Sequence, residues 1–183
     1  ILEHGKNPRN LGKTDDFNKD ARGHNPLCGD NVHIYLKLNG QRIVEDISFE
    51  GSGCAISMAS ASIMTDLIRG KNEHEAKEIV EDFLGMIKEN PELKSENLDE
   101  DEKTKLMCLS GVKQYPMRVK CATLSWHTLV SAFDDKNEEV NEKGAIMHRY
   151  GFNRDTTQGI HPLAAEFETK NTREKHHKKI PIK

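Results

Sequence analysis

Alternating apolar and polar residues predict a β-hairpin in the first part of the chain. The run V-H-I-Y-L-K-L over residues 32–38 places its even-numbered apolar residues on one face, which is the period of a half-buried strand. An Asn-Gly dipeptide follows, and R-I-V-E-D-I-S-F over residues 42–49 returns as a second strand. Because both positions of a two-residue hairpin turn need positive φ, Asn-Gly is a strong signal there. We expect an antiparallel pair over residues 32–49, with a short strand before Cys28.

Two helices are predicted after the hairpin. The stretch Ala55–Arg69 is rich in small residues and predicts a helix that Gly70 ends. Asn72 and Glu75 then have the spacing of a capping box. Apolar residues follow at helical spacing until Pro91 ends this second helix.

The remaining segments are less regular. Residues 1–12 predict the tail of a short helix and a loop rich in helix breakers. Residues 92–103 are strongly charged and predict an exposed loop or a frayed helix start, and residues 106–112 are apolar again. Pro116 introduces a last helix over residues 117–133.

Together these elements predict the α+β class, with a small antiparallel sheet packed on one face by helices. Steady periodicity is lost from residue 134 onward, and the chain ends in a basic run. We therefore expect a domain over residues 1–135 and a C-terminal extension over residues 136–183 that packs weakly or lies over the core. The pattern does not indicate a role for this extension.

Composition and charge narrow the classes of function. The 183 residues carry a net charge of −3 and no basic stripe with interleaved aromatic residues, which argues against a nucleic-acid partner. No apolar stretch has the length of a membrane span. The four cysteines are too widely spaced for a disulfide-rich module or a C-x-x-C zinc ribbon, so we expect a reducing cytoplasmic location. The chain opens at Ile1 without a Met, which leaves a removed presequence open.

Cysteines and one aspartate are the candidate chemistry. Cys28 and Asp30 share a short loop on which both can chelate one ion. Cys54 stands where a glycine-rich turn becomes a helix, and Cys121 is expected in the first turn of the last helix; both positions favour a thiolate. Three thiolates and a carboxylate suit zinc. The alternative is that each cysteine is a small buried hydrophobe, and we prefer that interpretation for Cys108 in the run L-M-C-L.

Charged residues near Cys121 add a second feature. Arg118 and Lys120 either place positive charge beside the thiolates or are solvated charges at a helix start. The nine histidines are scattered without ligand-like spacing. His33 is expected to face away from the apolar side of its strand, and His127 lies off the face of Cys121.

Four segments in a specific order carry a resemblance to a known family. They are H-G-K-N-P-R-N-L-G, N-P-L-C-G-D, F-E-G-S-G-C-A-I-S-M-A-S-A-S and R-V-K-C-A-T-L-S-W, at residues 4–12, 25–30, 49–62 and 118–126. The chain resembles the U-type (IscU/NifU-like) iron–sulfur assembly proteins, and within them the SufU type. Scaffold-type members usually have a His directly before the last cysteine, where this chain has Lys120. The 66 residues between Cys54 and Cys121 leave room for the extra helical segment of the SufU type.

The resemblance implies a SufE/NifU-like fold and a zinc-dependent sulfurtransferase. Zn²⁺ would be held by Cys28, Asp30, Cys54 and Cys121. A SufS-type cysteine desulfurase would be the partner, Cys28 would be the catalytic nucleophile that leaves the zinc to accept persulfide sulfur, and downstream iron–sulfur assembly proteins would follow. Two alternatives stay open: a scaffold for a transient [2Fe–2S] cluster on the same cysteines, and a zinc-stabilised interaction module without chemistry. Lys120 argues against the scaffold, and a displaceable Cys28–Asp30 loop argues against the module.

Overall fold

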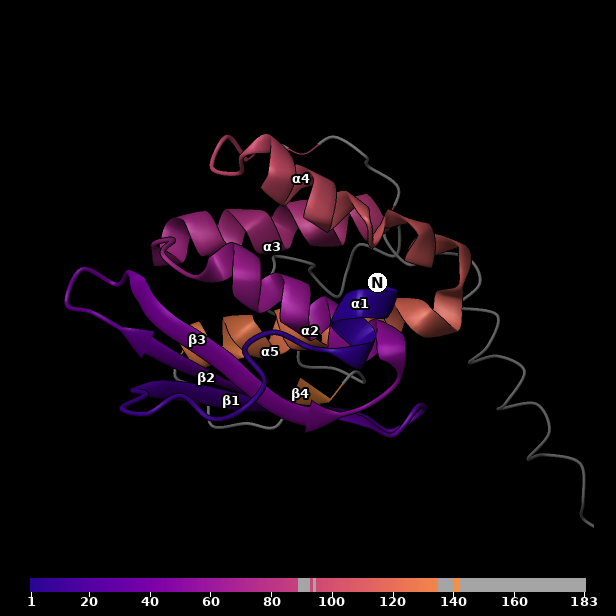
Figure 1. Cartoon of the computed structure of the whole chain (residues 1–183), viewed down its shortest axis with the longest axis horizontal. Helices are drawn as coiled ribbons and strands as arrows, with labels where there is room; N and C mark the ends of the chain where they lie inside the picture. Colours follow the sequence, from indigo (N-terminus) through magenta and orange to yellow (C-terminus); the bar gives the residue numbers. More distant parts are fainter. Residues whose placement is uncertain (89–92, 94, 135–139, 142–183) are drawn as a thin grey trace, which may run out of the picture. The chain divides into compact units, whose positions relative to one another are not determined.

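Helices cover one face of a small β-sheet in the described part of the chain (Figure 1). The computed structural model describes residues 1–88, 93, 95–134 and 140–141. The elements in chain order are α1 (Leu2–Lys6), β1 (Lys19–Asn25), β2 (Asp30–Leu38), β3 (Val44–Ser52), α2 (Ala55–Ile68), α3 (Glu73–Lys88), α4 (Glu100–Met107), the 3-10 helix η1 (Ser110–Gln114), α5 (Pro116–Phe133) and β4 (Val140–Asn141). The predicted α+β class is confirmed.

The sheet has the order β3-β2-β1-β4. β2 pairs antiparallel with both β1 and β3, so the predicted hairpin and the predicted strand before Cys28 are both present. The two residues of β4 pair in parallel with β1 at Gly23 and His24. This pairing uses residues beyond the expected boundary at residue 135. The rest of the expected extension lies outside the described residues, and the boundary itself stays a prediction.

The turn between β2 and β3 differs from the predicted two-residue turn. Neither Asn39 nor Gly40 has a positive φ, and Arg42 has φ 59° instead. The Arg42 N–H donates to the carbonyl of Asn39 at 2.9 Å. The side-chain oxygen of Asn39 accepts the backbone N–H groups of Gln41 and Ile43 at 2.9 and 3.0 Å. The asparagine thus stabilises a longer turn through its side chain, which the dipeptide rule does not consider.

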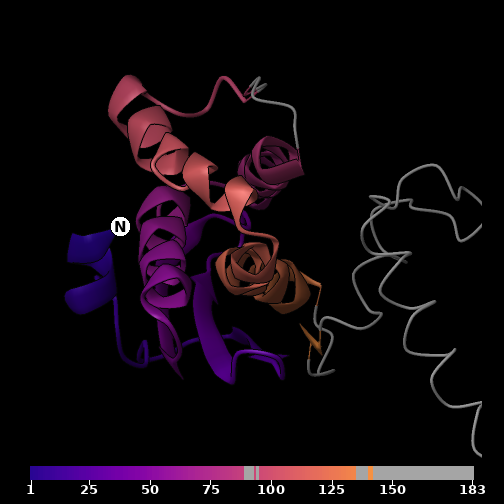
Figure 2. The ribbon, with the colours of Figure 1, turned by 90° about the vertical axis from the view of Figure 1, so that its right-hand side faces the viewer.

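The helices form two layers on the sheet. α2 and α5 lie directly over it, and α3 and α4 lie beyond them, as Figures 1 and 2 show from two directions. The even-numbered residues of β2, Val32, Ile34, Leu36 and Leu38, are buried as predicted. In the outer layer of the core the rings of Phe83 and Trp126 stack with centroids 4.2 Å apart. The core therefore lies between the sheet and α3.

The predicted helix boundaries hold in most places. α2 ends at Ile68, just before Gly70 with φ 82°. The predicted capping box is present, because Asn72 and Glu75 exchange backbone-to-side-chain hydrogen bonds of 2.9 and 3.0 Å. α3 is described to Lys88, and Pro91 lies outside the described residues.

The charged segment before residue 104 contains a defined helix start. Asp99 and Glu102 form a second capping box, with hydrogen bonds of 2.8 and 3.0 Å. Of the two alternatives predicted for residues 92–103, a loop or a frayed helix start, the helix start is present, and it is capped. Residues 92 and 94 lie outside the described residues.

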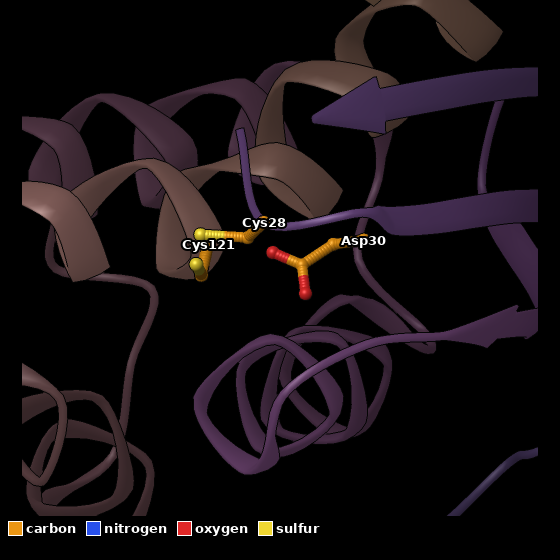
Figure 3. Close-up of side chains that lie close together, drawn as sticks. All are labelled: Cys28, Asp30 and Cys121. Atoms are coloured by element: carbon orange, nitrogen blue, oxygen red, sulfur yellow. The ribbon is translucent and has the colours of Figure 1, made fainter. Parts of the chain in front are cut away.

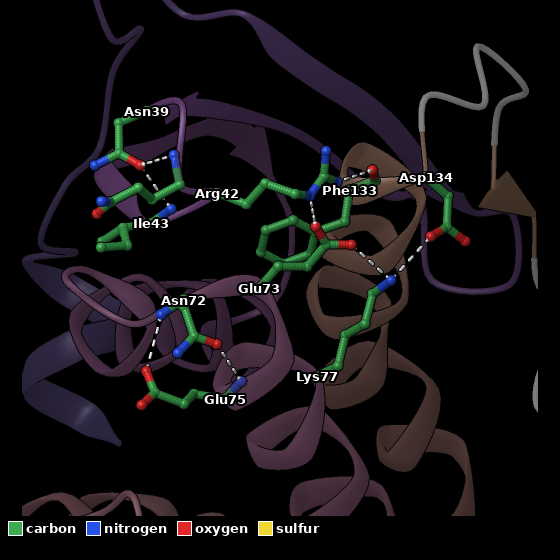
Figure 4. A network of polar contacts seen from close by, with 10 residues as sticks. Asn39, Arg42, Ile43, Asn72, Glu73, Glu75, Lys77, Phe133 and Asp134 are labelled. Carbon is green, nitrogen blue, oxygen red and sulfur yellow. Dashed lines mark hydrogen bonds and ion pairs between the residues drawn. The ribbon is translucent and has the colours of Figure 1, made fainter.

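An ion-pair network joins the β2–β3 turn to α3 and to the C-terminal end of α5 (Figure 4). Arg42 contacts Glu73 at the start of α3 through its Nε, and it donates to the carbonyl of Phe133 at 3.4 Å. Lys77 bridges Glu73 at 2.8 Å and Asp134 at 3.1 Å. The network therefore connects the sheet, α3 and the C-terminal end of α5.

No helix in the described part of the chain is long and apolar enough to cross a membrane.

Candidate metal centre

A four-residue loop between β1 and β2 presents Cys28, and Asp30 follows it as the first residue of β2. β1 ends at Asn25 and β2 begins at Asp30, and these two residues are directly paired in the sheet. The Gly29 N–H donates to the carbonyl of Asn25 at 2.8 Å, and Gly29 has φ 73°. Because L side chains rarely adopt that φ, glycine lets the chain turn back so tightly. Sheet pairing thus fixes both ends of the loop.

The carboxylate of Asp30 is fully buried and held from two sides. Its Oδ1 accepts the backbone N–H of Cys54 at 2.9 Å. Its Oδ2 accepts an N–H of the Asn25 side chain at 3.3 Å. Gly53 makes this approach possible, because a Cβ at that position would lie 2.6 Å from Oδ1. The glycine-rich turn therefore brings the backbone close to the carboxylate of Asp30.

Cys121 reaches the same place from α5. The helix begins at Pro116, a residue suited to the first helical position, so Cys121 lies in the second turn. The prediction that it lies in the first turn is wrong, because the proline itself opens the helix. The Sγ of Cys121 is buried near the carbonyl of Met117, at 3.7 Å, and the Nδ2 of Asn25, at 3.8 Å.

Three of the four expected ligands come together at this end of the sheet. The ligand atoms of Cys28, Asp30 and Cys121 all lie within 4.8 Å of one another. Figure 3 shows their side chains turned toward a common space. Two thiol sulfurs and one carboxylate form a donor set that suits zinc. Their assignment as ligands stays a prediction, and the donor set is compatible with it.

Cys54 is next to this group but not part of it. It is the N-cap of α2, and its Sγ accepts the Ser57 N–H at 3.5 Å. Its own N–H holds Asp30, as described above. The prediction that Cys54 stands at a helix start is confirmed. Its sulfur caps the helix instead of joining the Cys28–Asp30–Cys121 cluster.

Without a metal, Cys121 is a neutral thiol. Burial raises the pKa of Cys121 far above its usual range, and hydrogen bonds with Asp30 and Cys28 raise it further. The expectation that the helix dipole favours a thiolate here is therefore wrong for the metal-free site. Desolvation outweighs the dipole in the second helical turn, because the dipole acts mainly within the first turn. A bound cation would reverse this balance.

The two predicted supporting charges differ in their surroundings. Arg118 is exposed, and its hydrogen bond with Cys121 raises its pKa, with further contributions from the charges of Cys54 and Cys28. Negative charge on the cysteines would therefore favour the charged guanidinium. Lys120 is half-buried one residue before Cys121, and its carbonyl accepts the hydroxyl of Thr123 at 3.5 Å.

Cys108 does not belong to the core. It is exposed as the C-cap residue of α4, so the prediction of a buried core cysteine is wrong. The apolar run around it buries Leu106 and Leu109 and leaves Met107 and Cys108 outside, because the chain turns there from α4 toward η1.

His33 faces away from the apolar side of its strand, as predicted. Its ring contacts Asp20 at 2.6 Å and the hydroxyl of Tyr35 at 2.8 Å on the outer face of the sheet.

One residue of the site was missed in the sequence. It is Asn25, which contacts both Asp30 and Cys121, and the available signal was an asparagine five residues before Asp30. Gly53 belongs to the glycine-rich turn noted before Cys54, and it provides the space for the carboxylate.

Comparison with known proteins identifies relatives over most of the described chain. The family of NifU-like N terminal domains matches residues 1–122. The zinc-dependent sulfurtransferase SufU of Bacillus subtilis is 44% identical over 129 residues, which cover 70% of this chain and 83% of that protein. The iron–sulfur cluster assembly scaffold protein IscU of Thermotoga maritima is 39% identical over 133 residues, which cover 72% and 88%.

Solved structures share the fold. The crystal structure of FiSufU from Fervidobacterium islandicum AW-1 has a TM-score of 0.61 and 37% identity, and the match covers 72% of this chain and 91% of that one. A NifU-like N-terminal domain from Brucella abortus has a TM-score of 0.63 and 25% identity, over 73% and 88%. The chain therefore belongs to the family of NifU-like N-terminal domains.

Proposed function

We propose that this protein is a zinc-dependent sulfur acceptor that takes persulfide sulfur from a cysteine desulfurase for iron–sulfur cluster biogenesis. The observation that carries the proposal is the meeting of Cys28, Asp30 and Cys121 at one end of the sheet. The similarity to a SufU protein named as a zinc-dependent sulfurtransferase supports it. In this proposal residues 1–135 form the working domain, residues 136–183 an extension, and the protein acts in the cytoplasm.

Zinc would be held by Cys28, Asp30 and Cys121, with Cys54 as the fourth ligand. When bound, Zn²⁺ keeps its cysteine ligands deprotonated at neutral pH. Burial raises the pKa of Cys121, and a bound cation would oppose that shift. A carboxylate is also a harder donor to zinc than a thiolate, which eases the exchange of a ligand.

Cys28 is the proposed sulfur acceptor because it is the accessible member of the cluster. It is half-buried on a short loop, whereas Cys121 is buried in a helix. The thiolate of Cys28 attacks the outer sulfur of the desulfurase persulfide. A new S–S bond forms on Cys28, the S–S bond of the donor breaks, and the donor cysteine leaves as a thiolate, so no oxidant is needed. Arg118 and Lys120 would supply positive charge beside the incoming persulfide.

The test is a mass-resolved transfer of sulfur from free cysteine, with a SufS-type desulfurase and protein assayed for bound metal. We expect one additional sulfur on Cys28 of the zinc-loaded protein. Cys28→Ser should abolish this product, and Asp30→Ala should lower both zinc content and sulfur acceptance. Cys108→Ser is the matched control, because that cysteine is exposed outside the cluster. Unchanged zinc content and sulfur acceptance in Asp30→Ala would refute the proposal.

A scaffold for a transient [2Fe–2S] cluster is the second candidate. IscU scaffold proteins from Streptococcus pyogenes and Thermotoga maritima, each 39% identical to this chain, favour it. Soft thiolates at Cys28, Cys54 and Cys121 would also hold iron. A coloured, iron-dependent cluster without any persulfide on Cys28 would rank this function first. Downstream assembly proteins would then receive a cluster instead of sulfur.

A further inference from the structure

We propose that Asn25 is a positioning residue of the metal centre, whose side-chain amide holds Asp30 and Cys121 in place so that Cys28 is the ligand free to leave. The inference rests on the proposed function for the identity of the mobile ligand. The role of Asn25 itself is argued from its contacts and is tested by metal binding alone.

The side-chain amide of Asn25 is buried, and both its oxygen and its nitrogen make hydrogen bonds. Asn25 has no exposed surface. Its Oδ1 accepts the N–H of Leu27 at 3.2 Å, and this contact fixes which way the amide faces. Its Nδ2 therefore points to the site, where it donates to Asp30 Oδ2 at 3.3 Å and to Cys121 Sγ at 3.8 Å. One amide group thus joins two expected ligands that are 91 positions apart in the sequence (121 − 30).

These contacts act on the two ligands in a way that favours metal binding. An N–H donor stabilises a thiolate and a carboxylate in their charged forms. Inside a protein such a bond is stronger than in water, because the local dielectric is low. Side chains that orient the ligands of a metal typically change its affinity by roughly 10- to 100-fold when they are replaced. We expect Asn25 to contribute on this scale.

Cys28 is held differently from the other two ligands. It lies on the loop whose ends are Asn25 and Asp30, and the side chain of Leu27 before it is 59% exposed. Asn25 clamps the base of this loop through its carbonyl, which accepts the Gly29 N–H at 2.8 Å. Cys28 is partly exposed on this loop, whereas Asp30 and Cys121 are buried. The amide of Asn25 thereby contacts the two buried expected ligands, and its hydrogen bonds within the described part of the chain do not include the Cys28 side chain.

The first experiment measures zinc affinity by competition with a chromophoric chelator. Asn25→Asp keeps an oxygen for Leu27 but replaces the Nδ2 donor by a second carboxylate oxygen facing Asp30. Asn25→Ser removes the donor without adding charge. We expect both to lose roughly 10- to 100-fold in zinc affinity. Asn31→Asp is the matched control, because Asn31 is exposed at the same end of β2, with its amide on Ser52; its affinity should stay at the wild-type value.

The second experiment distinguishes positioning from general destabilisation. In a Cys108→Ser background, the zinc-loaded wild type should be alkylated at Cys28 before Cys121. In Asn25→Ser this order should be lost, with Cys121 reacting earlier, and the Co²⁺-substituted protein should show altered thiolate-to-metal absorption bands. Circular dichroism of the metal-free variants should match the wild type.

Three outcomes would overturn the inference. They are wild-type zinc affinity in both Asn25 variants, an unchanged alkylation order, and metal-free variants that are unfolded, which would make Asn25 a folding residue. The affinity and alkylation experiments contain no desulfurase. A failure of sulfur transfer in the test of the proposed function would therefore not change their results. A wild-type protein that binds neither Zn²⁺ nor Co²⁺ would instead refute the proposed function.

Discussion

His127 in α5 has a buried ring nitrogen, Nδ1, without a hydrogen-bond partner among the described residues. Burial, together with a smaller contribution from the charge of Lys88, lowers the pKa of His127 to about 4. The imidazole is therefore neutral in the folded protein at neutral pH.

This histidine predicts a loss of stability in mild acid. In the unfolded chain its pKa is about 6.5, so the unfolded state binds more protons between pH 6.5 and 4. The free energy of unfolding should fall as the pH drops through that window, by up to about 3 kcal/mol. His127→Leu should remove this contribution. Urea unfolding at pH 7.5 and pH 5 measures the free energy of unfolding of the metal-free wild type and of the variant. An identical pH dependence in the two proteins would contradict the prediction.

Residues of the site were predictable where the chemistry is local. Cys28 and Asp30 are two positions apart in the sequence, and the glycines before Cys54 signal a helix start. The local sequence was therefore sufficient to single out these residues. Asn25 was not predictable in this way, because its amide acquires its role from Cys121, 96 positions away. The protonation of Cys121 was missed for the same reason: burial depends on the whole fold.

At the scale of elements, Gly23 determines how closely β1 and α5 can pack. A Cβ at this position would collide with Thr128 and come within 3.1 Å of Leu124, both on α5. Gly85 in α3 is the opposite case, since nothing lies within 4 Å of the corresponding position. Close packing against α5 therefore explains a glycine at position 23, and no such contact explains Gly85.

Replacing these glycines by alanine should have opposite effects. We expect Gly23→Ala to lower the free energy of unfolding by about 1–3 kcal/mol, because β1 and α5 must separate. Gly85→Ala should raise it by about 0.5–1 kcal/mol, because alanine favours the helix. Urea unfolding compares the pair, and a stable Gly23→Ala variant would show that the two elements can shift apart at little cost.

The sequence predicted most elements and was less accurate at their ends. Alternation identified β2, whose even-numbered apolar residues are buried, and the Asn-Gly signal indicated the return strand β3. Glycine and capping residues located the end of α2 and the start of α3. The β2–β3 turn was mispredicted because Asn39 acts through its side chain. β4 was missed because two residues show no periodicity, and only pairing with β1 defines the strand.

At the scale of the whole molecule, the network in Figure 4 connects the β2–β3 turn with α3 and the C-terminal end of α5. Burial opposes the charge of Glu73, but hydrogen bonds from Arg42 and Lys77 outweigh it, so the pKa of Glu73 is lowered. Burial likewise opposes the charge of Lys77, and its bonds to Glu73 and Asp134 raise its pKa. The interactions therefore stabilise the charged forms of both residues.

Removing the charge of Glu73 should loosen this connection. We expect Glu73→Gln to lower the free energy of unfolding by about 1–3 kcal/mol at pH 7. The difference from wild type should be present above the unfolded-state pKa of about 4.3 and disappear as the pH falls through the lower folded-state pKa. Glu100→Gln is the control, because its side chain is 90% exposed in its pair with Lys103, and it should change stability by less than about 0.5 kcal/mol. Equal effects of both variants would contradict the prediction.

Metal removal should leave the fold standing. The core between the sheet and α3 contains large residues with almost no exposure, including Phe49, Phe83 and Trp126, and none belongs to the metal centre. We expect a chelator to lower the midpoint of thermal unfolding through lost binding energy and to leave the far-ultraviolet circular dichroism unchanged at 25 °C. Unfolding on chelation would instead support the module whose zinc only holds the structure.

The long separation of the clustered residues also bears on the order of events during synthesis. Cys28 precedes Cys121 by 93 residues (121 − 28), which a ribosome adds in roughly 5–20 s at about 5–20 residues per second. During that interval a nascent chain presents Cys28, Asp30 and Cys54 without the cysteine of α5 and without the helix that buries them. The complete cluster exists only after α5 has docked on the sheet. A metal ion that needs all of the expected ligands could therefore be bound only by the finished domain.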